Sequence, residues 1–133
     1  MNFDMQIRNA NASDVEGIYH LLHANGWAHR VDDINELDRL ILASQRVVVA
    51  VFDDEIIGFA RAITDGISNG YMSMVVVAEA CRRQGIGQAL VEQLVGSEPH
   101  ITWMLRAGRE GASEFFSKLG FIPSTTAMER PRR

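Results

Sequence analysis

The chain lacks the features that would place it in an oxidising compartment or in a membrane. It has one cysteine among 133 residues, Cys81, so no disulfide can form within the chain. No apolar run approaches the roughly 20 residues that a membrane helix requires. The N-terminal residues have neither the basic segment nor the apolar core of a secretory signal. We therefore expect a cytoplasmic protein that has no membrane partner.

The chain also lacks an excess of positive charge and a recognisable set of metal ligands. Its 13 Lys and Arg are outnumbered by 17 Asp and Glu, which gives a net charge of −4. Nucleic-acid binding depends on a basic surface, so we expect no nucleic-acid partner. His20 and His23 are near enough in sequence to share a helix face, but no further ligand follows at a recognisable spacing, so no metal is predicted. The length suits a single domain over residues 1–133.

The most informative stretch joins an apolar, β-branched run to an amphipathic helix through a polar loop rich in glycine. Such a junction presents free backbone N–H groups at the positive end of a helix dipole, an arrangement that binds phosphate. Glycine lets the backbone approach a ligand where a Cβ would intrude. The residues are, in order, the run Val75, Val76 and Val77 and the loop and helix start Arg82, Arg83, Gln84, Gly85, Ile86, Gly87 and Gln88.

The spacing excludes the two commonest phosphate loops. A P-loop ends in Gly-Lys-Ser/Thr, whereas Gly87 is followed by Gln88 and Ala89. A dinucleotide fingerprint needs a third small residue at the position of Leu90. Two interpretations stay open at this point: a different phosphate-binding loop, or a strand–turn–helix junction whose glycines serve only its geometry.

Apolar periodicity predicts a mixed α/β (α+β) sheet. The period changes from helical to strand-like near residue 46, and Ser13 with Glu16 has the spacing of a capping box for the first helix. Three strands in sequence followed by β-α-β indicate a mixed sheet with helices on its faces. In the order β-α-α-β-β-β-α-β-α-β, the expected elements are residues 5–8, 14–24, 33–43, 46–52, 55–64, 71–77, 85–95, 101–105 and 112–119 and a last strand from 121 onward.

Two motifs resemble those of the GCN5-related N-acetyltransferase (GNAT) family. Arg82, Gly85 and Gly87 fit the family's pyrophosphate loop, Gln/Arg-x-x-Gly-x-Gly/Ala. Residues 112–121, Ala-Ser-Glu-Phe-Phe-Ser-Lys-Leu-Gly-Phe, resemble the family segment Ala-x-x-Phe-Tyr-x-Lys-Leu-Gly-Phe. The element order is similar to that of the acyl-CoA N-acyltransferase fold along the whole chain. The chain thus looks like a small bacterial-type member.

The resemblance implies an acetyl-CoA-dependent N-acetyltransferase. Acetyl-CoA would be the cosubstrate, and a primary amine would attack its thioester directly within a ternary complex. The backbone of 75–77 would pair with the pantetheine arm, the loop 82–88 would bind the pyrophosphate, and Phe116 would lie beside the cofactor. The acceptor stays open between a spermidine-like amine, an arylalkylamine, an antibiotic and a protein terminus.

Three departures from the family pattern bear on catalysis. Phe116 stands where the family often has a tyrosine that protonates the leaving thiolate, and Met74 stands where many members have a carboxylate. Arg109 replaces a family asparagine. The alternative function is therefore an acyl-CoA-binding sensor or partner protein with little or no transferase activity.

Three other residues are the catalytic candidates, each with a structural alternative. Tyr71 could donate a proton or bind the thioester, or could pack as strand tyrosines do. His29 could act as a general base, as histidines often do, or could lie on a surface loop. Asp65 could bind or deprotonate the amine, or could stabilise its turn. A small domain with exposed sheet edges also predicts a homodimer.

Overall fold

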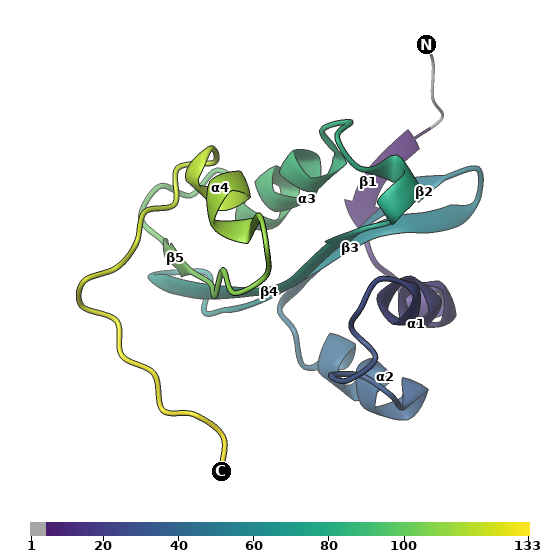
Figure 1. Ribbon diagram of the computed structural model, residues 1–133, viewed down its shortest axis with the longest axis horizontal. Coiled ribbons are helices and arrows are strands. Elements are labelled where there is room, and N and C mark those ends of the chain that lie inside the picture. The colour runs from purple at the N-terminus through teal and green to yellow at the C-terminus, as the bar shows by residue number, and fades with distance from the viewer. Residues whose placement is uncertain (1–4) are drawn as a thin grey trace.

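A five-stranded sheet forms the centre of the fold (Figure 1). The computed structural model describes residues 5–133. Neighbouring strands follow chain order across the sheet, antiparallel from β1 to β4, and β5 pairs with β4 in parallel. The strands are β1 (Met5–Asn9), β2 (Arg46–Phe52), β3 (Glu55–Thr64), β4 (Asn69–Val77) and β5 (Thr102–Met104).

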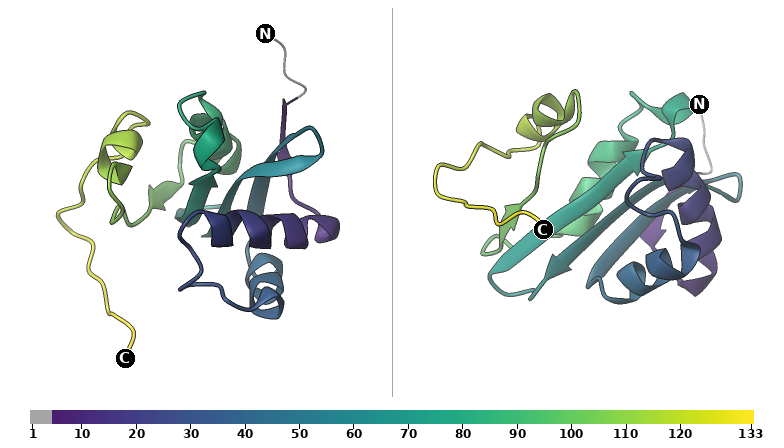
Figure 2. Two further views of the ribbon diagram at one scale, coloured as in Figure 1. Left: turned by 45° about the vertical axis from the view of Figure 1, so that its right-hand side comes forward. Right: turned by 60° about the horizontal axis from the view of Figure 1, so that its bottom comes forward.

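Helices cover both faces of this sheet, as Figure 2 shows. On one face lie α1 (Val15–Ala24) and α2 (Ile34–Leu42), and on the other lie α3 (Ile86–Val95) and the short α4 (Ala112–Ser117). Two apolar cores result, one under each layer of helices. Phe59 and Val49 belong to the core beneath α1 and α2, and Ala60 and Met72 to the core beneath α3. The predicted fold class, a mixed sheet with helices on its faces, is confirmed.

The β2–β3 hairpin has the predicted bounds, and its turn explains why. Asp53 and Asp54 both adopt positive φ, 54° and 62°. This conformation matches the twist of a two-residue hairpin, and aspartate tolerates it better than most residues. The hairpin therefore fixes the register of the strand that carries Phe59 and Arg61.

The capping box of the first helix lies two residues earlier than predicted. The Asn11 side chain accepts a hydrogen bond from the backbone of Ser13 at 3.0 Å, and Asp14 accepts one from the backbone of Asn11 at 2.8 Å. A 3₁₀ turn over Ala12–Asp14 then leads into α1. The predicted cap, Ser13, is wrong because Asn11 already satisfies the first free N–H groups of this turn.

The predicted last strand is also wrong. The backbone N–H of Phe121 donates to the carbonyl of Phe116 at 3.1 Å and so closes the end of α4. Pro123 has no N–H to give to a sheet, and the Ser124 hydroxyl accepts from the backbone of Ala127 in a local turn. The segment after α4 therefore runs away from the sheet, as the yellow trace in Figure 1 shows.

The sheet divides where β4 and β5 separate. Their pairing ends at Tyr71 and Met104. The Trp103 ring packs directly over Gly70, where no Cβ would fit. The Arg46 guanidinium lies over the same ring, 5.5 Å from its centre. Beyond this fixed point, β4 continues alone on that side to Val77. Within residues 5–133, no helix is both long and apolar enough to cross a membrane.

Candidate active site

The loop before α3 presents a row of free backbone N–H groups. Within the described chain, none of the six amides from Arg83 to Gln88 has a hydrogen-bond acceptor, and the first bond of the helix runs from Ala89 to Gly85 at 3.1 Å. Arg83 and Gly85 adopt left-handed φ, 67° and 80°. Such a turn gathers successive amides into a concave anion site at the positive end of the helix dipole. The row fits a pyrophosphate group.

The two glycines of the loop are needed for different reasons. Gly85 has positive φ, and no atom of the described residues lies within 4 Å of the place where its Cβ would be. A Cβ on Gly87 would instead lie 3.0 Å from the Phe115 ring of α4. Gly85 therefore sets the shape of the loop and leaves it open to a ligand, whereas Gly87 lets α3 and α4 pack closely.

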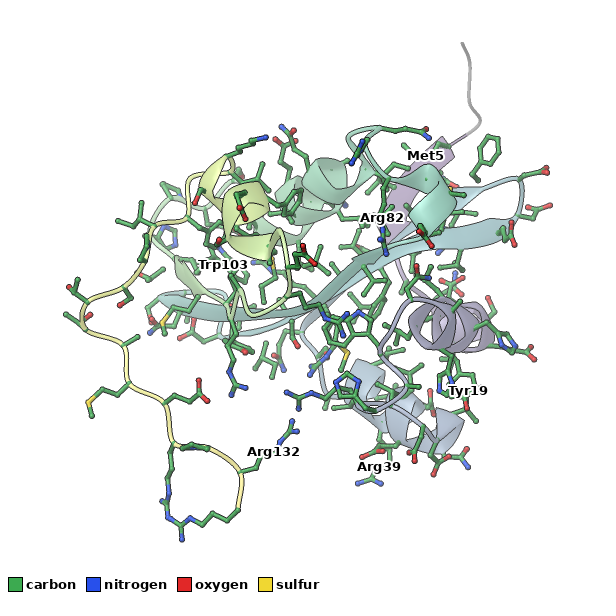
Figure 3. All side chains as sticks on the ribbon, in the orientation of Figure 1. Met5, Tyr19, Arg39, Arg82, Trp103 and Arg132 are labelled. Carbon is green, nitrogen blue, oxygen red and sulfur yellow. The ribbon has the colours of Figure 1, made fainter. Side chains whose placement is uncertain are left out.

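The Arg82 side chain, labelled in Figure 3, anchors its end of the loop through hydrogen bonds to two neighbouring elements. Its Nε donates to the Val77 carbonyl at 2.9 Å, and an Nη donates to the Asn25 side chain at the end of α1, at 3.1 Å. The side chain thus joins the end of β4 to α1. Arg83 is exposed and forms no ion pair among the described residues, so its guanidinium is available to a phosphate.

The unpaired edge of β4 continues from this loop. A β-bulge interrupts the β3–β4 register between Phe59 and Arg61, and Met74 there has φ of 61°. Because β5 leaves the sheet at Met104, no strand of residues 5–133 pairs with the edge of β4 over 72–77 on that side. Backbone groups of an open edge pair with an extended ligand as they would with a strand. Val75, Val76 and Val77 lie on this edge.

A cavity of about 730 Å³ adjoins the middle of β4. Its walls come from the loop after α1, from α2, β3 and β4, and from the segment that leads into α4. The structure brings four of the predicted site residues together in this cavity: His29, Tyr71, Val75 and Phe116. Met74 lines it as well, so no carboxylate stands at the position that the family uses on this strand.

Asp65 does not line this cavity. Its Oδ1 accepts hydrogen bonds from the backbone of Ile67 and Ser68, both at 2.8 Å, and of Asn69 at 3.2 Å. These bonds favour the charged carboxylate and hold the pKa of Asp65 well below its usual range. Asp65 is therefore a poor proton acceptor, and its bonds stabilise the β3–β4 turn.

Arg61 and Glu36 of the cavity were missed in the sequence, and Arg109 was noted there only as a departure from the family pattern. Arg61 is 9% exposed in the middle of β3, and Glu36 of α2 is the one carboxylate among the lining residues. Arg109 donates to the Gly26 carbonyl at 3.0 Å and lies over the Trp27 ring, 3.8 Å from its centre. The sequence did contain a signal for Arg61, since an arginine between two alanines in an apolar strand needs a polar or charged partner.

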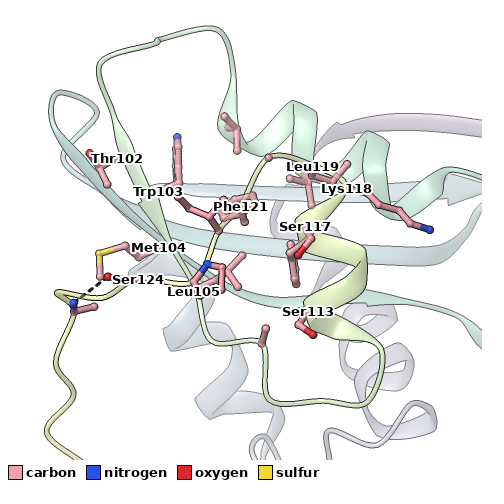
Figure 4. A pocket seen from close by; sticks show the side chains of 18 of the residues that line it. Thr102, Trp103, Met104, Leu105, Ser113, Ser117, Lys118, Leu119, Phe121 and Ser124 are labelled. Carbon is pink, nitrogen blue, oxygen red and sulfur yellow. Dashed lines mark hydrogen bonds between the residues drawn. The ribbon is translucent and has the colours of Figure 1, made fainter.

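A second hollow, of about 1190 Å³, lies between α3, β5, α4 and the chain that follows (Figure 4). Trp103, Leu119 and Phe121 line it, and the tail residue Ser124 lies at its rim. The hollow exists because the segment after α4 does not join the sheet. Gln88 and Phe116 are the predicted site residues that contribute to its wall.

Residues 43–123 match the family described as the acetyltransferase (GNAT) domain. The chain therefore belongs to the GNAT acetyltransferase family. The PanD regulatory factor of Salmonella typhimurium is 30% identical over 92 residues, which cover 65% of this chain and 72% of that protein. The PanD regulatory factor of Escherichia coli is 28% identical over the same shares.

Solved structures of the family share the fold. A GNAT-family acetyltransferase of Streptococcus pneumoniae superposes with a TM-score of 0.80 at 24% identity, over 97% of this chain and 98% of the other. An aminoglycoside N-acetyltransferase in complex with CoA gives a TM-score of 0.77 at 18% identity, over 100% and 97% of the two chains.

Proposed function

We propose that the protein binds acetyl-CoA and transfers the acetyl group to a primary amine held in the 730 Å³ cavity. The observation that carries this proposal is the row of free amides over 83–88, continued by the unpaired edge of β4. The two features lie in the order that a pyrophosphate followed by an extended pantetheine arm requires. The cavity lies further along the same strand, where the acetyl group would arrive.

The chemistry is direct attack of the neutral amine on the thioester carbon. A tetrahedral intermediate forms, its C–S bond breaks, and coenzyme A leaves as a thiolate while the new amide loses a proton to solvent. Positioning two reactants in one site supplies a large share of such a rate enhancement, about 7–11 kcal/mol. Backbone N–H groups on the β4 edge would stabilise the oxyanion of the intermediate.

The cavity walls supply the residues for proton transfer. His29 and Glu36 lie on the α1–α2 side and are the candidates for taking the amine proton, directly or through water. The Tyr71 hydroxyl on β4 is the candidate for donating a hydrogen bond or a proton to the thiolate, because Phe116 has no proton to give. A thiol is acidic enough to leave unprotonated, so the reaction does not depend on an acid at Phe116.

Calorimetry and turnover together test this proposal. The wild-type protein should bind acetyl-CoA at one site, and a colorimetric assay of the released thiol should report turnover with at least one amine. Replacing His29 with Gln should lower turnover without weakening acetyl-CoA binding. Absence of binding at millimolar acetyl-CoA would contradict the whole proposal, whereas binding without turnover would contradict only the transfer step.

The similarity to the PanD regulatory factors favours a second candidate function. In it, the protein binds acetyl-CoA and, in that form, regulates a PanD homologue by contact. The phenylalanine at 116 and the methionine at 74 agree with this candidate, since neither can move a proton. Co-purification of the PanD homologue from the same organism, with and without acetyl-CoA, separates the two functions, because the enzyme does not require that partner.

A further inference from the structure

The acceptor cavity is strongly basic in an acidic chain. Five arginines line it against one glutamate, although the chain as a whole has a net charge of −4. The arginines come from separate parts of the chain: Arg30, Arg61, Arg106, Arg109 and Arg132. Figure 3 shows Arg132 on the side of the sheet that carries α2. A cationic wall attracts anions and repels cationic substrates.

Arg61 is the most informative of the five because it is buried without a countercharge. Its side chain is 9% exposed, one Nη donates to the Ser44 hydroxyl at 3.0 Å, and its Nε has no acceptor. No carboxylate forms an ion pair with it in the described residues. Burial lowers the pKa of this guanidinium, and the nearby Tyr71 opposes the shift. A buried donor left unpaired is costly, and Arg61 lines the cavity, so a ligand there can supply a countercharge to its guanidinium.

The other arginines differ in whether their guanidinium groups already have a partner within the protein. Arg106 pairs with Glu129 at 3.4 Å. Arg109 is occupied by the Gly26 carbonyl and the Trp27 ring. Arg30 has no ion pair or side-chain hydrogen bond among the described residues. Arg30 and Arg61, together with Arg132 of the C-terminal segment, are thus the guanidiniums of the cavity wall that no carboxylate or carbonyl of residues 5–133 satisfies.

This positive charge is separate from the phosphate loop. Arg61 is opposite Ser73 in the β3–β4 register, four residues before Val77. At about 3.3 Å per residue, Ser73 lies roughly 13 Å from Val77, where β4 ends ahead of the loop. The row of amides over 83–88 already fits the pyrophosphate, so Arg61 is left for the other substrate.

We propose that the acceptor is a small amine that also carries a carboxylate, with the carboxylate bound by Arg61 and Arg30. Guanidinium groups bind carboxylates with two parallel hydrogen bonds, which fits a buried arginine with free donors. Glu36, the one acid of the wall, would then face the amine end. Polyamines and aminoglycosides, which carry several positive charges, are poor fits. The inference rests on the proposed acetyl transfer for the identity of the site as the acceptor site.

The test compares product analogues that differ only in charge. N-acetylglycine and N-acetylphenylalanine are each titrated against their uncharged carboxamides, with the full-length protein saturated by CoA, and binding is followed by NMR. We expect each carboxylate to bind at least tenfold more tightly than its carboxamide. Equal affinities, or no binding of either carboxylate at 10 mM, would overturn the inference.

Variants show whether the arginines cause the preference. Arg30→Gln and Arg61→Met should each reduce the carboxylate preference several-fold, while Arg39→Gln, which removes the same charge from the outer surface of α2, should not (Figure 3). Arg30 is on a loop, so its variant serves if Arg61→Met does not fold. Weaker acetyl-CoA binding in Arg30→Gln, with an unchanged carboxylate preference, would assign the arginines to the nucleotide and overturn the inference.

Turnover separates this inference from the proposed function. A carboxylate preference without acetylation of glycine or phenylalanine would uphold the anion site and contradict acetyl transfer to such amines. Acetylation of spermidine at a kcat/KM equal to that of the amino acids would uphold transfer and overturn the anion site.

Discussion

Replacing Gly85 with alanine should weaken acetyl-CoA binding far more than it weakens the fold. Gly85 has φ of 80°, and nothing lies within 4 Å of the position of a Cβ. Left-handed φ costs a non-glycine residue about 1–2 kcal/mol, and the lower entropy of the unfolded alanine chain returns about 0.4–1 kcal/mol. The net loss of stability is therefore about 1 kcal/mol, which lowers the melting temperature by about 4 °C.

The loss of affinity should be larger because the methyl group is added within the row of free amides over 83–88. Each hydrogen bond between an amide and a phosphate contributes about 1.5–3 kcal/mol. Loss of one such bond weakens binding about 10- to 150-fold. Gly66→Ala is the matched control, since Gly66 has φ of 72° and equally open surroundings in the β3–β4 turn.

Calorimetry with acetyl-CoA and thermal unfolding of both variants are the assays. The two variants should unfold at similar temperatures, and only Gly85→Ala should lose affinity. A folded Gly85→Ala protein with the affinity of the wild type would refute the assignment of the loop.

Three further predictions concern catalysis, stability and assembly. Phe116→Tyr should raise turnover by a modest factor if thiolate departure limits the rate, and should leave acetyl-CoA affinity unchanged; a large loss of affinity would show that the residue is misplaced. Asp14 accepts two hydrogen bonds from Arg8, at 2.8 and 3.0 Å, which lower its pKa below the ordinary 3.8. A carboxyl whose pKa is lower in the folded than in the unfolded state stabilises the folded protein at pH values above the unfolded-state pKa. This stabilisation is lost as the pH falls through the folded-state pKa. Urea unfolding should therefore show stability declining below about pH 4, and Asp14→Asn should cost about 1.5–3 kcal/mol at pH 7 and flatten that decline; an unchanged pH profile in the variant would contradict this. We also expect a homodimer, because a small domain with exposed sheet edges has surface to protect; light scattering that reports a monomer at micromolar concentration would contradict it.

Local chemistry made most of the fold predictable from the sequence. The two aspartates at 53 and 54 adopt the turn that their type favours, and the bounds of β2 and β3 follow from it. The turn between β4 and α3 was predictable for the same reason, since its glycines and its place between strand and helix are local features; its binding of phosphate stays a prediction. The prediction of a last strand after residue 120 was wrong because the backbone N–H of Phe121 bonds to the end of α4 instead of to a neighbouring strand.

The cavity beside β4, the proposed acceptor site, depends on contacts between distant residues, so the sequence showed only part of it. Arg61 and Tyr71 come together through the β3–β4 register and the bulge at Met74, which no local pattern specifies. Phe116 was identified from the resemblance, and His29 from the resemblance and from the suitability of histidine as a base; the fold does bring them to one cavity. Asp65 was selected for its carboxylate, but three backbone N–H groups of its own turn already bind it.

The most direct test of the central claim is an NMR titration of isotopically labelled protein with acetyl-CoA. The account predicts that the amide resonances of 83–88 shift together with those of the β4 edge over 75–77, saturating at one equivalent of bound ligand. Amides of the β2–β3 turn at 53–54 should not move. If millimolar acetyl-CoA leaves the resonances of 83–88 unchanged, the loop is not a pyrophosphate site and the account is contradicted.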